Sequence, residues 1–224
     1  YTGIATCDGK LLYMERLEQD GGDLRQSAAV VFARDAYNGR TLWTWEAPGG
    51  WNVYNSLAIT SDGQLFVRCG NQKVFRLDSA TGRVLSEVVS NVRREARIAL
   101  LTDDLFLLGG DVYSTKTGKF LWKFPKHKYQ PMRGTIVGEH IYFCDGTNLH
   151  SRRLADGVEI WKKAIPKLPA PFGSLSRAGD YLMIRMQDNA RRGGSRDECR
   201  VMILNPTDGT VRWNYTWKVR ISAN

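Results

Sequence analysis

The sequence predicts an all-β fold, a β-propeller of four-stranded antiparallel blades, with about five blades in 224 residues. The first observation behind this prediction is a nine-residue phrase that occurs five times: DAYNGRTLW (35–43), DSATGRVLS (78–86), STKTGKFLW (114–122), RLADGVEIW (153–161) and NPTDGTVRW (205–213). Its glycines, Gly39, Gly82, Gly118, Gly157 and Gly209, are 43, 36, 39 and 52 residues apart. This period is typical of a repeat unit that is too small to bury its own core and must stack on its neighbours.

Each phrase is predicted to form a hairpin turn between two strands. In all five phrases Asn, Thr or Asp directly precedes the glycine, as in Asn38-Gly39 and Thr81-Gly82, and such pairs favour tight turns because glycine accepts a positive φ. A β-prone run precedes each turn, such as KVFRLD before Gly82. The run after the turn ends in tryptophan at Trp43, Trp122, Trp161 and Trp213, whereas Ser86 takes this place in the second phrase.

A second hairpin lies upstream of the phrase in each repeat. Examples are SLAIT and QLFVRC around Ser61-Asp62-Gly63, and GTIV and HIYFC around Gly138-Glu139. Two hairpins give four strands per repeat, which is the composition of a propeller blade. No segment has the 3.6-residue apolar period that a helical solenoid of similar repeat length requires. The expected blades cover approximately 1–46, 47–88, 89–125, 126–164 and 165–217, within one domain spanning 1–224.

The phrase Asp-x-x-Thr-Gly-Lys/Arg-x-Leu-Trp resembles the docking motif of pyrroloquinoline-quinone (PQQ)-like propeller repeats, and KTGKFLW, ending at Trp122, matches it best. In that family the tryptophan of one blade packs against a peptide plane near the turn of the next blade. The resemblance therefore implies a structural role for the five glycines and four tryptophans. Because Ser86 replaces one tryptophan, it also implies that one contact is missing and that this junction is weak.

The PQQ-like family is normally exported and normally has seven or eight blades. The resemblance therefore implies a periplasmic or otherwise exported bacterial protein. It leaves open whether five blades close by themselves or whether the chain is a fragment of a larger propeller.

The family has an enzymatic and a non-enzymatic branch. Quinoprotein dehydrogenases hold PQQ and a calcium ion, with a disulfide between adjacent cysteines over the quinone and an aspartate as base. The BamB-like outer-membrane assembly propellers are cofactor-free scaffolds that bind proteins. Here Cys7, Cys69, Cys144 and Cys199 are far apart in the sequence, which favours the BamB-like branch and no cofactor, with PQQ and calcium as the alternative.

Other catalytic or metal-binding motifs are not recognised in the sequence. His127, His140 and His150 are too scattered to indicate a metal cluster, and His140 and His150 are expected to be structural. The four cysteines are expected to be small buried thiols. We therefore predict no catalytic residue and no metal ligand, although a glycan-acting propeller, which needs two facing carboxylates, stays open as an alternative.

Charge is the last informative feature. Lys and Arg number 32 against 23 Asp and Glu, a net charge of +9, which favours an anionic partner. In a four-stranded blade the connections between second and third strands, and from one blade to the next, lie at one end, and basic residues gather there. The predicted binding residues of this basic loop face are Arg93, Arg94, Arg97, Lys126, Lys128, Arg133, Arg191, Arg192 and Arg196.

The leading hypothesis is thus a non-enzymatic scaffold whose basic loop face binds a protein or an acidic surface polymer. Two long insertions, 15–29 and 187–198, project onto the same face. No nucleic-acid module is present, so a nucleic-acid partner is not favoured, and no 18-residue apolar stretch predicts a membrane span. The alternatives are part of a PQQ-dependent dehydrogenase, a glycan-acting enzyme, or a structural domain that joins other blades or domains in a longer chain.

Overall fold

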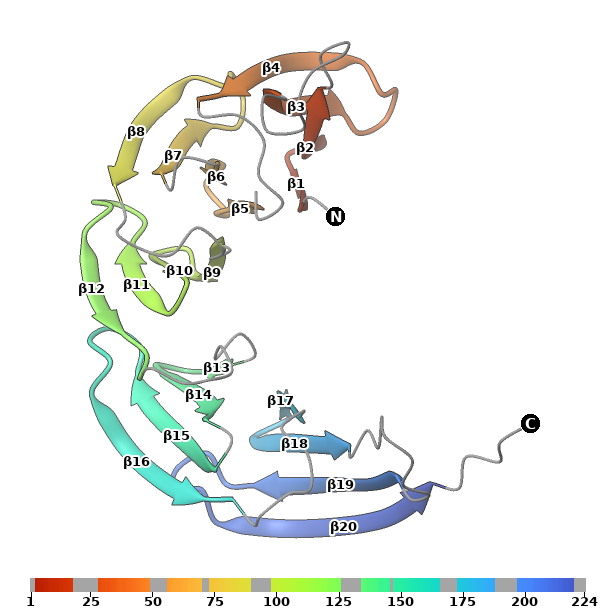
Figure 1. The fold of residues 1–224 in the computed structure, drawn as a ribbon, viewed down its shortest axis with the longest axis vertical. Coiled ribbons are helices and arrows are strands. Elements are labelled where there is room, and N and C mark those ends of the chain that lie inside the picture. Colours follow the sequence, from red (N-terminus) through yellow and green to blue (C-terminus); the bar gives the residue numbers. More distant parts are fainter. Residues whose placement is uncertain are drawn as a thin grey trace. The chain divides into compact units, whose positions relative to one another are not determined.

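The structure is a computed structural model that describes residues 3–17, 28–48, 56–69, 73–89, 98–125, 134–145, 147–165, 173–187 and 197–219. Within these ranges it contains twenty strands and no helix (Figure 1). The strands form five four-stranded antiparallel sheets, each in simple sequential order. The predicted fold class, an all-β propeller of four-stranded blades, is confirmed. The chain divides into two compact units, Tyr1–Lys123 and Phe124–Asn224.

The first unit contains three blades. Blade 1 comprises β1 (Ile4–Cys7), β2 (Lys10–Leu17), β3 (Ala28–Asp35) and β4 (Thr41–Ala47). Blade 2 comprises β5 (Ser56–Ile59), β6 (Gln64–Arg68), β7 (Lys73–Asp78) and β8 (Val84–Val89). Blade 3 comprises β9 (Ile98–Thr102), β10 (Leu105–Leu108), β11 (Asp111–Ser114) and β12 (Phe120–Lys123).

The second unit contains two blades. Blade 4 comprises β13 (Thr135–Val137), β14 (His140–Cys144), β15 (Asn148–Arg153) and β16 (Glu159–Ala164). Blade 5 comprises β17 (Gly173–Ala178), β18 (Tyr181–Gln187), β19 (Asp197–Leu204) and β20 (Val211–Val219). The expectation that residues 1–224 form one domain stays a prediction.

Every blade has a β-bulge at the same point of its last hairpin. The register shifts between Ala33 and Arg34 in blade 1 and between Arg76 and Leu77 in blade 2, and blades 3, 4 and 5 repeat the shift. One residue of the fourth strand is left without a cross-strand partner, and it directly precedes the tryptophan position: Leu42, Leu85, Leu121, Ile160 and Arg212. The bulge therefore accounts for apolar side chains that are exposed here, such as Leu42 and Ile160.

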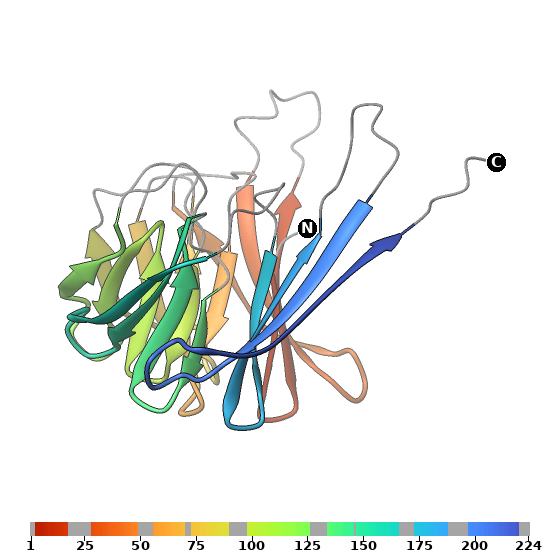
Figure 2. The same ribbon diagram turned by 90° about the horizontal axis from the view of Figure 1, so that it is seen from below.

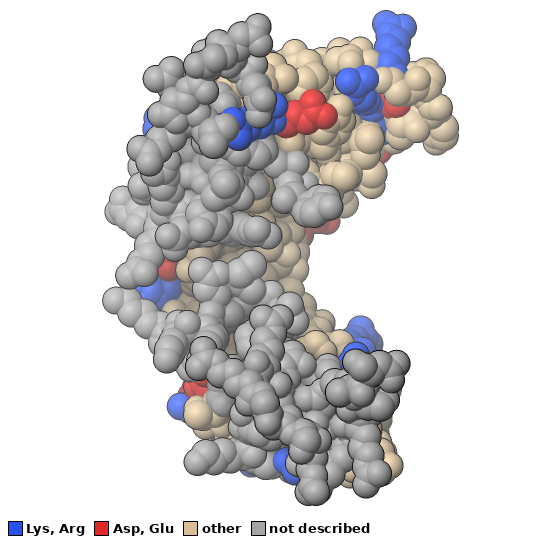
Figure 3. All heavy atoms as spheres, turned by 45° about the vertical axis from the view of Figure 1, so that its right-hand side comes forward, with Lys and Arg blue, Asp and Glu red and all other residues tan. Residues whose placement is uncertain are grey.

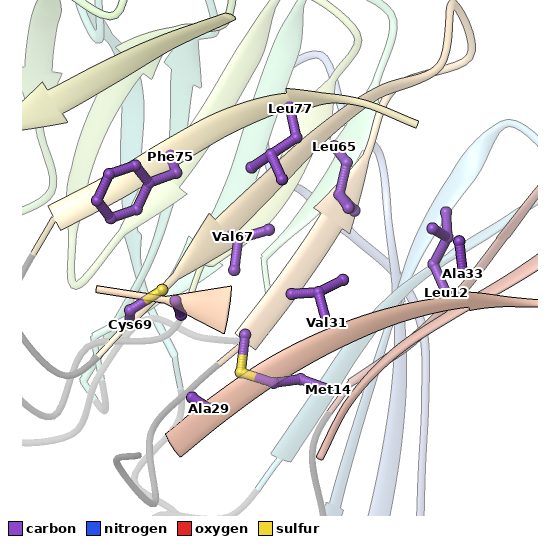
Figure 4. Packing of buried hydrophobic residues seen from close by; sticks show 11 residues of the cluster. Leu12, Met14, Ala29, Val31, Ala33, Leu65, Val67, Cys69, Phe75 and Leu77 are labelled. Atoms are coloured by element: carbon purple, nitrogen blue, oxygen red, sulfur yellow. The ribbon is translucent and has the colours of Figure 1, made fainter. Parts of the chain in front are cut away.

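The hydrophobic cores lie between successive blades of each unit. Between blades 1 and 2, Leu12, Met14 and Val31 face Leu65 and Val67, and all five are buried (Figure 4). Phe66 lies between Leu65 and Val67 in β6, points to the opposite face of the sheet, and packs with Phe106, Leu108 and Tyr113 of blade 3. In the second unit, Tyr142 and Leu149 of blade 4 pack with Leu182, Ile184 and Met202 of blade 5. Because both faces of blade 2 are covered, its strands are almost continuously apolar, as in LFV of β6.

The short turns of each blade lie at one end of its sheet. In Figure 2 the turns that join β1 to β2 and β17 to β18 are at the lower end of their own sheets. The turns formed by the nine-residue phrases join the third strand to the fourth, so antiparallel order places them at this same end. Among the described residues, no helix has the length and hydropathy that crossing a membrane requires.

Candidate functional site

The predicted basic loop face lies outside the part of the chain that the structure describes. This holds for all of its residues: Arg93, Arg94, Arg97, Lys126, Lys128, Arg133, Arg191, Arg192 and Arg196. On the coloured surface of Figure 3, basic and acidic side chains are interspersed and most of the surface is neither. The candidate site that can be built from contacts is therefore the set of junctions made by the nine-residue phrase.

The turn of the phrase is held by its first residue. In blade 2 the Gly82 amide donates to the Asp78 carbonyl (2.8 Å), while the amides of Ala80 and Thr81 donate to Asp78 Oδ1 (2.8 and 3.0 Å). Partial burial raises the pKa of Asp78, but these amide hydrogen bonds outweigh it and hold the pKa below its ordinary value. The phrase glycines, Gly39, Gly82, Gly118, Gly157 and Gly209, all have φ between 67° and 75°. This is the left-handed conformation that glycine adopts without steric cost.

The first junction joins blades 1 and 2 through Trp43. Its indole Nε1 donates to the Ser79 carbonyl at 3.0 Å, and its six-membered ring lies over Gly82. A Cβ on Gly82 would lie 2.7 Å from Trp43 Cε3. The glycine is therefore required twice, by its backbone conformation and by the close approach of the ring.

The junction between blades 4 and 5 repeats this arrangement in the second unit. Trp161 Nε1 donates to the Pro206 carbonyl at 3.0 Å, and a Cβ on Gly209 would lie 2.7 Å from Trp161 Cζ3. Ser79 and Pro206 occupy the same position, the second residue of the phrase. The tryptophan thus recognises one backbone carbonyl and one glycine of the next turn.

The second junction, between blades 2 and 3, uses other residues for the same contacts. Ser86 stands at the tryptophan position, but Val88 covers Gly118, where a Cβ would lie 2.6 Å from Val88 Cγ2. Arg76 donates to the carbonyls of Thr115 (3.2 Å) and Lys116 (3.0 Å), and Thr115 is the equivalent of Ser79. The tryptophan contact is absent, as Ser86 implied, but the junction is closed by a different set of side chains.

Cross-strand pairing explains this replacement. Trp43 lies opposite Ala33, and Trp161 lies opposite Ser151, so a large side chain pairs with a small one. At the second junction the order is reversed, because the small Ser86 lies opposite the long Arg76. Either strand of the hairpin can supply the donor that reaches the next turn.

His150 forms a separate buried cluster in blade 4. Its ring stacks on Phe143 at 4.8 Å, and its two nitrogens face Asp145 Oδ2 (2.8 Å) and Glu159 Oε2 (3.0 Å). Each ring nitrogen is thus within hydrogen-bond distance of a carboxylate oxygen, which as an ion only accepts hydrogen bonds. Partial burial raises the pKa of Asp145, but hydrogen bonds from His150 and from the Thr147 and Asn148 amides outweigh it and hold the pKa well below its ordinary value.

The same ring also hydrogen-bonds Glu159 and lowers its pKa. His150 was expected to be structural, and its buried ring, occupied on both sides, fits that expectation. Its partners come from the β14–β15 turn and from β16, and only the strand register places them beside it. The cluster ties β16 to the β14–β15 hairpin.

The described residues do not match the donor set of a quinoprotein site. Cys7, Cys69, Cys144 and Cys199 are free thiols, and burial raises the pKa of Cys69 to about 12. Burial and the charge of Asp145 likewise raise the pKa of Cys144 to about 12, so neither thiol forms a thiolate near neutral pH. Among the residues whose placement is described, no group of three or more His, Cys, Asp and Glu side chains is positioned to hold a metal ion.

Repeated four-stranded blades joined by the glycine–tryptophan phrase define a propeller of the PQQ-like class. A model of the family described as outer membrane protein assembly factor BamB matches residues 27–189. This is more than half of the chain, and the protein belongs to this family.

Two solved structures show the same fold at low identity. BamB from Moraxella catarrhalis is 16% identical, with a TM-score of 0.57 over 98% of this chain and 77% of that one. The C-terminal WD40 domain of Sif2 is 13% identical, with a TM-score of 0.60 over 96% of this chain, which spans 59% of the Sif2 chain. A search of the curated proteins found no match.

Proposed function

We propose that the protein is a non-enzymatic scaffold of the BamB family that is exported and binds a protein or an acidic surface polymer through its basic loop face. The observation that carries the proposal is the family match over residues 27–189, since that family is described as an outer membrane protein assembly factor. The charge supports an anionic partner, because the chain has a net charge of +9.

The position of the basic residues along the chain also supports the proposal. At the junctions between blades 1 and 2 and between blades 4 and 5, phrase residues are used in packing, which favours other parts of the blades for a partner. Arg93, Arg94 and Arg97 lie in the chain between β8 and β9, and Arg191 and Arg192 lie between β18 and β19. In each unit these connections leave the sheet at the end opposite to the phrase turns. Loops at one end of a repeat scaffold are the usual place of its binding function.

Charge reversal with a matched control tests the basic loop face. The test variant changes Arg93, Arg94, Arg191 and Arg192 to glutamate. The control variant changes four exposed residues of the nine-residue phrases to glutamate, and so alters the net charge equally: Arg40, Arg83, Lys119 and Arg212. We expect the test variant alone to lose partner capture from the host cell envelope and to elute from a heparin column at lower salt. Equal retention of both variants, or equal loss, would contradict the proposal.

We further propose that the protein functions without PQQ or calcium. The four free and separate cysteines support this, because the quinoprotein arrangement needs an adjacent pair. Incubation with PQQ and calcium, followed by dialysis and an absorbance spectrum, should leave no bound quinone, and alcohol-dependent dye reduction should be absent. Stoichiometric quinone uptake with turnover would favour the dehydrogenase instead.

A further inference from the structure

The two faces of blade 2 are covered in different ways, although a blade of the same unit packs on each. Toward blade 1 the buried cluster reaches the outer strand β4 at Ala47, and Trp43 and Trp45 of that strand pack against it. Toward blade 3, among the described residues, the buried cluster reaches the outer strand β8 at Val88 alone. The first junction is therefore apolar out to its edge, and the second is not.

Hydrogen bonds take the place of apolar contacts at three points of the second junction. Between the inner strands, the Ile98 amide donates to Ser56 Oγ at 2.9 Å. At the short turns, the amide and hydroxyl of Ser61 donate to the carboxylate of Asp103, which is exposed. At the outer strands, Arg76 donates to two carbonyls of the blade 3 turn. Water replaces such bonds when two surfaces separate, so their net contribution to stability is small compared with that of buried apolar contacts.

Arg76 also gains hydrogen bonding when the second junction opens. Its Nε is buried and has no hydrogen-bond partner among the described residues. A buried N–H without a partner costs free energy in the closed junction, and water satisfies it in the open one. At the first junction the donor is Trp43 Nε1, which is satisfied by the Ser79 carbonyl, and opening would expose the indole ring to water. The two donors therefore favour opening at the second junction.

We propose that the second junction opens transiently in the folded protein while the first junction stays closed. Local openings of this kind occur where a protein has the fewest buried apolar contacts. The chain between β8 and β9, which joins the two sides of this junction, carries Arg93, Arg94 and Arg97. The opening thus separates the two blades that this basic connection joins. The inference goes beyond the proposed function, because it concerns the chain without a partner.

Thiols on opposite faces of blade 2 test the proposal. Val67 is fully buried at the first junction (Figure 4), and Val74 is fully buried at the second. The variants Val67→Cys and Val74→Cys make the same change on the two faces, and the native Cys69 at the first junction is an internal reference in both. Iodoacetamide labelling of the folded protein, followed by mass spectrometry of the peptides, gives the rate at each thiol.

We expect position 74 to be labelled at least ~30-fold faster than position 67, which corresponds to a difference of about 2 kcal/mol in the free energy of opening. Position 67 and Cys69 should react at similar slow rates, because both wait for the first junction to open. Leu108→Cys, in the buried cluster of the second junction on the blade 3 side, replaces Val74→Cys if that variant does not fold. Equal labelling on the two faces of the folded protein would overturn the proposal, as would faster labelling at the first junction.

A pair of charge-matched variants then connects the opening to its hydrogen bonds. Asp103→Ala, made in Val74→Cys, removes the acceptor of both Ser61 bonds and should raise labelling at position 74 by about 3- to 10-fold. Asp62→Ala removes a carboxylate whose hydrogen bonds with Thr60 and Gln64 stay within blade 2, and it should leave the rate at position 74 unchanged. Labelling of Cys69 should be unaffected in both. An equal response of position 74 to the two variants would contradict an opening controlled at this junction.

Discussion

The first and second junctions of the first unit make the same backbone contacts with different side chains. At the first junction one residue, Trp43, covers the glycine and hydrogen-bonds the carbonyl of the next turn. At the second junction Val88 covers the glycine and Arg76 hydrogen-bonds the carbonyl. The difference shows what the phrase turn of the following blade requires. Apolar atoms must cover its glycine, and one N–H group must donate to the carbonyl of the second phrase residue, Ser79 or Thr115. Tryptophan is the residue that supplies both.

Truncation of the tryptophan should give the largest difference between the junctions. Trp43→Ala should lower the free energy of unfolding of the first unit by about 3 kcal/mol, because it removes a large packed ring and leaves a cavity. Ser86→Ala, at the equivalent position, should change it by less than ~0.5 kcal/mol. Urea denaturation of both variants measures the difference. Similar losses would mean that Ser86 contributes to its junction in a way that the contacts do not show.

Replacement of the phrase glycines by alanine distinguishes two contributions to stability, the positive φ of the glycine and the close approach of the tryptophan ring. Gly39→Ala should cost about 1–2 kcal/mol, because its positive φ strains any L-residue. Gly82→Ala has the same strain, but its Cβ would also lie 2.7 Å from the Trp43 ring. It should therefore cost about 1–3 kcal/mol more than Gly39→Ala. The comparison is made by thermal and urea unfolding in dilute protein, and equal costs would show that the Trp43 ring moves aside freely.

Removal of the arginine should affect only the second junction. Arg76→Ala should cost about 1–2 kcal/mol, because it removes the hydrogen bonds to the Thr115 and Lys116 carbonyls. The loss should depend little on salt, since both acceptors are uncharged carbonyls. Arg83→Ala, in the exposed turn of the same blade, is the control and should change stability by less than ~0.5 kcal/mol. A larger loss in Arg83→Ala than in Arg76→Ala would contradict the role of Arg76.

Acid should weaken the second unit through the carboxylates that face His150. The pKa values of Asp145 and Glu159 are lowered in the folded chain, so their stabilisation is present above the unfolded pKa and is lost as pH falls. We expect the free energy of unfolding of this unit to fall between about pH 5 and pH 2. At the first junction Trp43, Ser79 and Gly82 do not titrate, and the lowered pKa of Asp78 gives the turn a dependence of the same sign.

Asp145→Asn is the matching variant for this pH dependence. It keeps an oxygen for the Thr147 and Asn148 amides but loses the charge beside His150. Its plateau near pH 7 should be lower by about 1 kcal/mol, and its acid slope should be shallower. Denaturation curves at several pH values report both quantities. An unchanged acid slope would place the titration on other carboxylates.

The fold was predictable because its signals are local. The glycine turn at Gly82 and the β-prone runs on either side of it are contained in one short segment, and the period then repeats them. The closure of the second junction was not predictable in this way. Arg76 and Val88 act for the missing tryptophan only because Arg76 lies opposite Ser86 and reaches Thr115, about 40 residues further along the chain.

The candidate functional residues also differ in how far the sequence predicts them. The His150 cluster depends on Asp145 and Glu159, which come from a turn and from another strand, so that residue spacing gives no sign of them. Arg93 and the other residues of the basic loop face were placed by the order of strands alone, and their role in binding stays a prediction.

The bulge that precedes every tryptophan position has a consequence for how such a chain can change over evolutionary time. Leu42 has no cross-strand partner, so its deletion would leave Thr41 opposite Arg34 and Trp43 opposite Ala33 in a regular register. The tryptophan itself and the glycine of the next turn are held by their mutual contact and have no such freedom. The bulge is thus the point at which this hairpin can lose a residue over evolutionary time and still keep its contact with the next blade.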